Sequence, residues 1–260
     1  MDRIKTKDIN ALDEQGQNLL HKAVLAGKGK QVQKLLDCGA QETKRNLWGA
    51  SAKDLATYLS LPFFQRPKEE AKGVSFYDKE GNYKNVLPKN TQEVFGFSYV
   101  HQLRFRKASE LFKLACGFFK MENEEYRTNG KAYLENEVEE PEHDLSIRWI
   151  DETFGYGCFA EREYRPGQLV GEYTGLVMPE SSCDPDNLYH FEYVQGWYID
   201  AQKFGNWMRF INHGEPNVNA IYAIYKGVGH ILFIAWKHIE KGQQLFYNYG
   251  ERYWEGAEAL

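Results

Sequence analysis

An asparagine and a histidine, Asn212 and His213, stand side by side in the stretch DAQKFGNWMRFINHGEPN that ends at Asn217. Their amide and imidazole groups can donate and accept hydrogen bonds, either to a ligand or to the chain itself. Gly214 and Pro216 follow the pair, and both residue types end regular structure. On its own, such a pair is usually present only because loops are rich in polar residues. A second stretch about 30 residues later, QLFYNYG, adds two tyrosines after an apolar run.

The elements that must position these residues are short strands. From Leu145 onward, runs of strand length that are rich in β-branched and aromatic residues alternate with turn residues. The runs are LSIRWI, QLVGEY, LYHFEYV, GWYIDA, NAIYAIY and HILFIAW. This pattern predicts a mostly β region built from several small sheets. Because the N-terminal segment has a helical pattern, the predicted fold class of the whole chain is α+β.

Four blocks of this region occur in an order that resembles the SET domain of protein lysine methyltransferases. They are GYGCFA, GEYTG, IDAQKFGNWMRFINHGEPN and QLFYNYG, and the resemblance covers about 115 residues. A lone GxG is a weak signal, whereas GNWMRFINHGEPN followed by an aromatic run that ends in Tyr-Gly is specific. The resemblance implies an S-adenosylmethionine-dependent methyltransferase in which the last two blocks form a knot-like crossing, a rare topology in proteins.

The resemblance also implies which residues contact the cofactor. Gly155 and Gly157 would let the main chain approach S-adenosylmethionine because they lack a Cβ, although glycines often serve only the turn. Tyr156 would lie alongside it, and Asn212 and His213 would hydrogen-bond its adenine and amino-acid ends. The remaining contacts implied by the matching are Tyr189, Arg209 and Trp254, with an internal ion pair as the alternative role of Arg209.

Tyr249 matches the catalytic tyrosine of the family. Methyl transfer is an in-line displacement, so the lysine amine and the methyl group must be aligned. A phenol, whose pKa is about 10, can orient both groups without carrying charge. A lysine of pKa about 10.4 is rarely neutral near pH 7.4, a penalty of about 4 kcal/mol that a narrow aromatic channel beside a sulfonium would reduce. Tyr173, Tyr247 and Tyr249 itself are candidates to line this channel, with the edge of the core as the alternative place for Tyr173.

Three positions give finer expectations or depart from the family pattern. A tyrosine at Tyr247, two residues before the catalytic one, implies a crowded channel that stops at monomethyl-lysine or at most dimethyl-lysine. Gly214 and Glu215 stand where many relatives have Ser and a zinc-binding Cys, and ERYWEGAEAL contains no cysteine. No zinc is therefore expected. Tyr253 and Trp254 become the aromatic candidates to close the clefts that would bind the cofactor and the substrate. Asn248 replaces an aspartate that is common in the family.

Composition indicates a globular chain. It has 260 residues, of which 42% are hydrophobic and 27% charged, and no apolar run approaches the ~18 residues of a membrane span. The four cysteines stand far apart, so they are expected to be isolated thiols in a reducing compartment. Residues 141–260 hold 9 Lys and Arg against 17 Asp and Glu, a net charge of −8, whereas residues 1–140 hold 23 against 20. The acidic half should attract cationic partners and repel nucleic acid, unless its charge serves only solubility.

The N-terminal segment, residues 1–62, has an internal period of 33 residues, which relates Gly16 to Gly49 and Ala23 to Ala56. NLLHKA and LLDCGA resemble the corresponding parts of the ankyrin repeat, and a second copy is present only in its first half. Two such units are too few to form a core alone, so they should pack on later parts of the chain. This surface is either a partner site or a structural cap.

Residues 63–140 form a connecting region. VSFYDKEGNYKNV predicts a hairpin centred on Gly81, and Val100 to Phe119 predicts a helix with a basic face. The acidic, proline-containing stretch ENEVEEPEH marks a boundary before the third segment, residues 141–260, which holds the SET-like blocks.

The predicted function is a protein lysine N-methyltransferase that acts on a histone or another basic tail. The alternative is an inactive SET and ankyrin adaptor that binds a protein partner. Neither hypothesis involves a membrane or direct nucleic-acid binding. The expected location is a reducing interior, a nucleus either of the protein's own cell or, for a bacterial effector, of a host cell.

Overall fold

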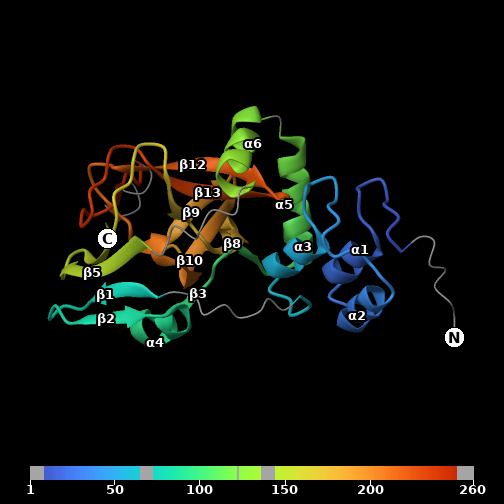
Figure 1. Cartoon of the computed structure of the whole chain (residues 1–260), viewed down its shortest axis with the longest axis horizontal. Helices are drawn as coiled ribbons and strands as arrows, with labels where there is room; N and C mark the ends of the chain where they lie inside the picture. Colours follow the sequence, from blue (N-terminus) through green and yellow to red (C-terminus); the bar gives the residue numbers. More distant parts are fainter. Residues whose placement is uncertain (1–8, 65–72, 122, 136–143, 251–260) are drawn as a thin grey trace.

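The computed structural model describes residues 9–64, 73–121, 123–135 and 144–250. Within these residues the N-terminal helices lie at one end of the molecule and the sheets that carry the SET-like blocks extend toward the other (Figure 1). The α-helices are α1 (Leu19–Leu25), α2 (Gly29–Asp37), α3 (Ala52–Tyr58), α4 (Thr91–Phe95), α5 (Ala108–Lys120) and α6 (Glu124–Gly130).

The strands confirm the predicted β-rich half. Each of the six runs picked from the sequence contains a strand, namely β5 (Leu145–Asp151), β7 (Leu169–Glu172), β9 (His190–Val194), β10 (Trp197–Gly205), β12 (Val218–Tyr225) and β13 (Val228–Ala235). The others are β1 (Val74–Tyr77), β2 (Tyr83–Val86), β3 (Ser98–Tyr99), β4 (Arg104–Phe105), β6 (Gly155–Ala160), β8 (Gly175–Pro179), β11 (Asn212–His213) and β14 (Phe246–Tyr247).

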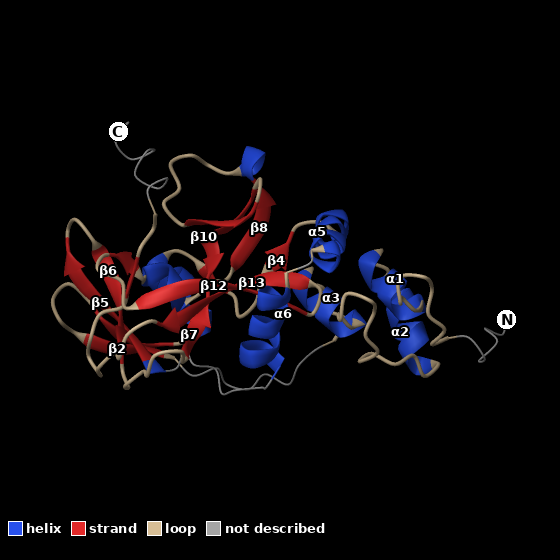
Figure 2. Cartoon of the chain, turned by 90° about the horizontal axis from the view of Figure 1, so that it is seen from above, coloured by secondary structure: helices blue, strands red, loops and turns tan. Residues whose placement is uncertain are grey.

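The strands form several small sheets, as the sequence predicted. One has the order β2-β1-β5-β6, a second β3-β10-β8-β4 with β9 added to β10, a third β12-β13-β7, and the fourth pairs β11 with β14. The strand β13 is buried along its whole length, because β12 and β7 flank it in the sheet and α5 packs on it. Figure 2 shows α6 beside β12, and the Asn129 side chain there donates to the Tyr222 carbonyl over 2.8 Å.

The connecting region holds the predicted hairpin, since β1 and β2 pair antiparallel around the turn at Gly81. The predicted helix is shorter than expected, because α5 begins only at Ala108. Before it, β4 pairs in parallel with β8 through Arg104 and Phe105. Leu103 and Phe105 are both buried, with the less buried Arg104 between them. This alternation has the period of two that is typical of a strand. Pairing with the edge of β8 therefore outweighs the helical pattern of the sequence.

The 33-residue period has a structural counterpart in two turns that have the same hydrogen bonds. The Asp13 Oδ1 atom accepts from the amides of Gln15 and Gln17, each within 2.9 Å. The Asn46 Oδ1 atom accepts from the amides two and four residues later, each over 3.0 Å. Gly16 and Gly49 both have positive φ, and capping boxes begin α1 at Asn18 and α3 at Ser51.

The second turn packs against the β-rich half. The Trp48 ring meets the Phe112 ring of α5 edge-on, with centroids 5.0 Å apart. A Cβ built on Gly227, in the β12–β13 turn, would lie 3.1 Å from the Trp48 Cβ. The neighbouring Lys226 pairs with Asp54 over 3.3 Å. As expected from the small number of repeat units, the N-terminal segment packs against later elements of the chain, namely α5 and the β12–β13 turn.

Replacing Trp48 by Ala tests how far this contact stabilises the fold. Trp48 is 8% exposed, whereas its neighbour Leu47 is 53% exposed. We expect Trp48→Ala to lower the free energy of unfolding by about 3–5 kcal/mol, as for other large aromatic truncations in cores. Leu47→Ala, the matched control, should change it by less than about 0.5 kcal/mol. Chemical denaturation of both variants measures the difference, and equal effects would contradict the packing argument.

Candidate active site

The stretch with the Asn-His pair and the stretch with the two tyrosines lie side by side. β11 and β14 pair in parallel, with Asn212 opposite Phe246 and His213 opposite Tyr247. Asn217 joins them further, because its Nδ2 donates to the Gln244 carbonyl over 2.8 Å and its Oδ1 accepts from the Phe246 amide over 2.9 Å. This side chain is 5% exposed. Two segments separated by about 30 residues are thereby fixed by side-chain as well as main-chain bonds.

The paired segments around β11 and β14, called the crossing below, hold Tyr249 at both ends. Its hydroxyl donates to the Ile211 carbonyl over 2.8 Å, and its amide donates to His213 Nδ1 over 3.2 Å. The predicted catalytic tyrosine is thus oriented by the residues immediately around the Asn-His pair.

Tyr173 and Tyr247 meet in an aromatic cluster that also contains Phe191, Phe233 and Tyr249. The Tyr247 ring stacks on Phe191 with centroids 5.6 Å apart and meets Phe233 edge-on at 5.3 Å. Tyr249 lies 6.0 Å from Tyr247, and Tyr173 lies 5.2 Å from Phe191. The structure therefore brings together the three tyrosines predicted to line a channel. The two phenylalanines were missed, although both stand within predicted strands.

Burial affects two of these tyrosines, Tyr173 and Tyr247, and raises the pKa of each above the ordinary value near 10. The hydroxyl of the buried Tyr173 donates to the Tyr189 carbonyl over 2.9 Å. A phenol of ordinary pKa is already neutral at physiological pH, and the raised values keep these two neutral to higher pH.

A hydrogen bond joins the GxG turn, residues 155–157, to the crossing. Asn212 Nδ2 donates to the Tyr156 carbonyl over 3.2 Å. Gly155 has a φ of +64°, which favours glycine, and a Cβ built there would meet no atom within 4 Å. A Cβ on Gly157 would instead lie 2.6 Å from Ile150 Cδ1 and 2.7 Å from Gln244 Nε2. A side chain at position 157 would thus need the ends of the Ile150 and Gln244 side chains to shift.

The Tyr156 ring is surrounded by other aromatic rings. Its centroid lies 5.2 Å from Trp149, 5.3 Å from Phe76 and 5.7 Å from Phe95. Phe76 comes from the hairpin and Phe95 from α4, so the connecting region forms one side of the GxG turn. Nothing in the sequence assigned this role to the hairpin.

Arg209 and Tyr189 form a stacked pair. The Arg209 guanidinium carbon lies 3.8 Å from the Tyr189 ring centroid and 4.4 Å from that of Phe97. Its Nη1 donates to the Gln202 carbonyl over 3.0 Å, while its buried Nε has no hydrogen-bond partner in the described chain. Within those residues no carboxylate pairs with Arg209, so the internal ion pair considered as its alternative role is replaced by stacking on aromatic rings.

The remaining expectations concern Tyr253 and Trp254, metal binding, the cysteines and membrane spans. Trp254 and Tyr253 lie outside the described residues. No cluster of three or more His, Cys, Asp or Glu side chains that could bind a metal ion occurs in residues 9–64, 73–121, 123–135 and 144–250. All four cysteines are free thiols. None of the described helices is both long and apolar enough for a membrane span.

Comparison with known proteins finds a family similarity in this region. Residues 155–250 match the SET domain, and strands β6 to β14 fall within the match. Among curated proteins, the chain is 36% identical over 117 residues to an H3 lysine-36 specific histone-lysine N-methyltransferase of Emericella nidulans, covering 39% of this chain and 12% of that protein. It is 29% identical over 172 residues to the N-lysine methyltransferase KMT5A-A of Danio rerio, covering 59% and 49%.

The similar solved structures include ctPRC2 in an autoinhibited conformation bound to S-adenosylmethionine. That match has 31% identity and a TM-score of 0.37, and it covers 42% of this chain and 15% of the other. The matched region spans at most about half the length of the two curated relatives.

Asn217→Ala tests the side-chain bonds that hold the crossing together. The change leaves the Gln244 carbonyl and the Phe246 amide without their partner, and each buried unsatisfied group costs about 1–3 kcal/mol. We expect the free energy of unfolding to fall by about 2–4 kcal/mol. Asn219→Ala, in β12 two residues later, is the matched control and should cost less than about 1 kcal/mol. Denaturant titration checks both, and equal losses would refute the role given to Asn217.

Proposed function

We propose that this chain is an S-adenosylmethionine-dependent protein lysine N-methyltransferase. The observation that carries the proposal is the parallel pairing of β11 with β14, which sets Asn212 and His213 against Tyr247 and Tyr249. The SET domain match of residues 155–250 and relatives named as lysine methyltransferases support the same activity.

Two features of the described residues support S-adenosylmethionine as the cofactor. The open space beside Gly155 and the unpartnered Nε of Arg209 lie on segments joined to the crossing. The residues proposed to hold the cofactor are Gly155, Tyr156, Gly157, Tyr189, Arg209, Asn212 and His213, with Trp254 as a further prediction. Bound S-adenosylmethionine would supply a sulfonium methyl group as the electrophile.

Tyr249 is proposed to orient the substrate amine. Its hydroxyl donates to the Ile211 carbonyl, which orients the phenol oxygen, and a phenol oxygen that donates one hydrogen bond can also accept one from an amine. The neutral rings of Tyr173, Tyr247, Phe191 and Phe233 would surround the lysine stem. Their low polarity disfavours an ammonium ion, which lowers the lysine pKa toward the neutral form that can react.

The substrate is proposed to be a basic tail, with histones as the leading class. The net charge of −8 over residues 141–260 favours a cationic peptide. Among the described strands β9 pairs only with β10, and its Phe191 belongs to the aromatic cluster. An extended peptide added to the other edge of β9 would bring a lysine beside the rings. A nucleus is the corresponding place of action.

The N-terminal part is proposed to be an ankyrin-like segment over residues 1–62, followed by a connecting region over 63–140 and the SET segment over 141–260. The repeated turns at Asp13 and Asn46 support the first of these. Its packing through Trp48 onto α5 favours the role of structural cap, while a protein partner on the remaining surface stays a second possibility.

Tyr249→Phe tests the catalytic assignment. Removing the hydroxyl should lower kcat by about 100-fold or more, the effect typical of a positioned acid–base or hydrogen-bonding group. Binding of S-adenosylhomocysteine, measured by calorimetry, should change less than about 3-fold, because the phenol is assigned to the amine. Tyr83→Phe, at a tyrosine that is 60% exposed in β2, is the control.

The same assay separates the enzyme from the adaptor hypothesis. Purified protein is incubated with radiolabelled S-adenosylmethionine and core histones. Transfer that Tyr249→Phe abolishes supports the enzyme, whereas no transfer together with no cofactor binding would favour the adaptor. Full activity of Tyr249→Phe would reject the role given to this residue.

Tyr247→Phe tests the number of methyl groups added. The Tyr247 ring is fixed between Phe191 and Phe233, so its hydroxyl reduces the space around the amine. We expect the unmodified protein to produce mainly monomethyl-lysine and Tyr247→Phe to shift the product toward dimethyl- and trimethyl-lysine. Mass spectrometry of a methylated peptide measures the distribution. Dominant trimethylation by the unmodified protein, or no shift in the variant, would contradict the proposal.

A further inference from the structure

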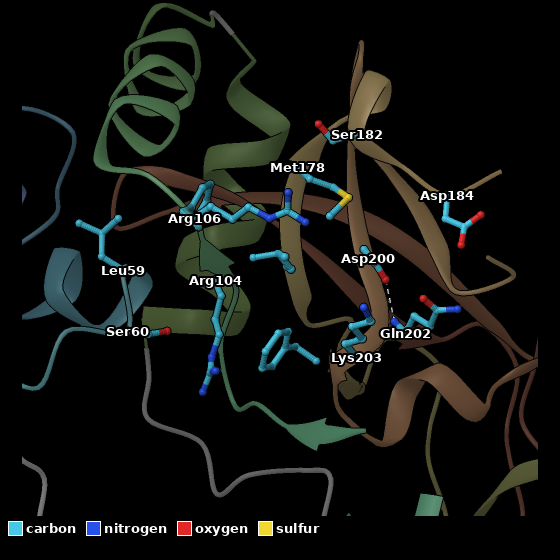
Figure 3. A pocket seen from close by; sticks show the side chains of 13 residues that line it. Leu59, Ser60, Arg104, Arg106, Met178, Ser182, Asp184, Asp200, Gln202 and Lys203 are labelled. Atoms are coloured by element: carbon cyan, nitrogen blue, oxygen red, sulfur yellow. Dashed lines mark hydrogen bonds between the residues drawn. The ribbon is translucent and has the colours of Figure 1, made fainter. Parts of the chain in front are cut away.

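A cavity of about 510 Å³ lies between the end of α3 and the strands β4, β8 and β10. Figure 3 shows Leu59 and Ser60 on one side of it and the strands that carry Met178, Asp200 and Lys203 on the other. None of the residues proposed to hold the cofactor or to act in methyl transfer lines this cavity, although Gln202, whose carbonyl accepts from Arg209, does. Its volume is in the range of pockets that bind small organic molecules.

Arg104 contributes a half-buried cation to the cavity. It belongs to β4, whose main chain pairs with β8, so the backbone beneath the guanidinium is fixed. The guanidinium carbon lies 5.2 Å from the Phe204 ring centroid. Within the described chain it has no ion pair, and burial lowers the pKa of Arg104 below its ordinary value with no carboxylate to oppose the shift. A desolvated arginine of this kind is complementary to an anion.

Ser60 lines the same cavity in a strained conformation. It follows α3 with a φ of +54°. Its amide bonds the Thr57 carbonyl, and the amide of Leu61 bonds the Ala56 carbonyl, the two bonds of a Schellman motif. The equivalent position 33 residues earlier is Gly27, with a φ of +64°. A glycine would therefore suit the turn, and the serine is present at a conformational cost.

The other charged side chains around the cavity favour an anion. Arg106 and Lys203 also line it and form no ion pair in the described part of the chain. Both carboxylates are engaged: Asp200 Oδ1 accepts from Asn187 and from the Gln202 amide, within 2.9 Å, and Asp184 Oδ1 accepts from the amide of Asp186 over 3.1 Å. Three cations thus face two hydrogen-bonded carboxylates, which gives the lining a formal charge of +1.

We propose that this cavity binds a small organic phosphate. The phosphate group would bond to the Arg104 guanidinium and the Ser60 hydroxyl, with Arg106 and Lys203 adding attraction. The organic part would contact the apolar wall formed by Leu176, Met178 and Phe204. The site is separate from the proposed methyl-transfer site, and its test does not depend on methyltransferase activity.

Calorimetric titration of the full chain at low salt tests the proposal, with uridine 5′-monophosphate as the probe and uridine and inorganic phosphate as comparisons. A pyrimidine is chosen to avoid an adenine-binding site, and saturating S-adenosylhomocysteine should leave the titration unchanged. We expect saturable binding of the monophosphate, at least about 10-fold weaker binding of inorganic phosphate, and no binding of uridine. Binding of uridine as tight as that of its monophosphate would overturn the assignment of an anion site.

Two variants locate the phosphate. Arg104→Gln should weaken binding by about 10- to 100-fold, the usual loss for a charged hydrogen-bonding pair. Lys120→Gln, an exposed cation at the end of α5, is the matched control and should leave it unchanged. Ser60→Gly should raise the melting temperature by about 2–4 °C, because it relieves backbone strain, and should still weaken binding several-fold.

The opposed effects of Ser60→Gly distinguish a ligand role from a structural one. Higher stability with unchanged affinity would show that the serine does not contact the phosphate. Arg104→Gln that binds as tightly as Lys120→Gln, with both folded by circular dichroism, would overturn the proposed site. Inorganic phosphate that binds as tightly as the monophosphate would overturn the contribution of the apolar wall.

Discussion

The pairing of β11 with β14 is the constraint on which the rest of the candidate site depends. Each strand has only two residues, so the main-chain bonds between them are few. The buried Asn217 side chain supplies two more bonds, and Tyr249 adds two that end on Ile211 and His213. A short pairing of distant segments loses chain entropy on closing, and these partly buried side-chain bonds offset part of that loss.

The sequence predicted the residues of the crossing better than it predicted their surroundings. Asn212, Tyr247 and Tyr249 stand in short blocks whose order is informative by itself. Phe191 and Phe233 were missed because a phenylalanine in a strand is ordinary, and only the fold shows that their rings meet Tyr247. Phe76 and Phe95 were missed for the same reason, since they reach Tyr156 from segments that lie 60 or more residues earlier in the chain.

Local patterns also failed where a neighbouring element competes. The basic stretch from Val100 has helical spacing, yet Arg104 and Phe105 within it form β4 and pair with the edge of β8. Arg209 illustrates the same limit for a single side chain. Sequence alone left a cofactor contact and an ion pair open for it, whereas the fold surrounds its guanidinium with the rings of Phe97 and Tyr189. Tertiary contacts decide such cases, since local propensities differ by only about 1 kcal/mol.

The departure at positions 214 and 215 has a physical reason in the crossing. A Cβ built on Gly214 would lie 2.5 Å from the Phe246 Cδ1 atom, so the Phe246 ring occupies the space that a serine side chain would need. Glu215 is largely exposed and pairs with Lys237 over 2.6 Å, an arrangement that contributes little in water. On another side of the crossing, the rings of Phe76 in the hairpin and Phe95 in α4 cover the Tyr156 ring, so segments before the SET-like blocks supply apolar contacts to the GxG turn.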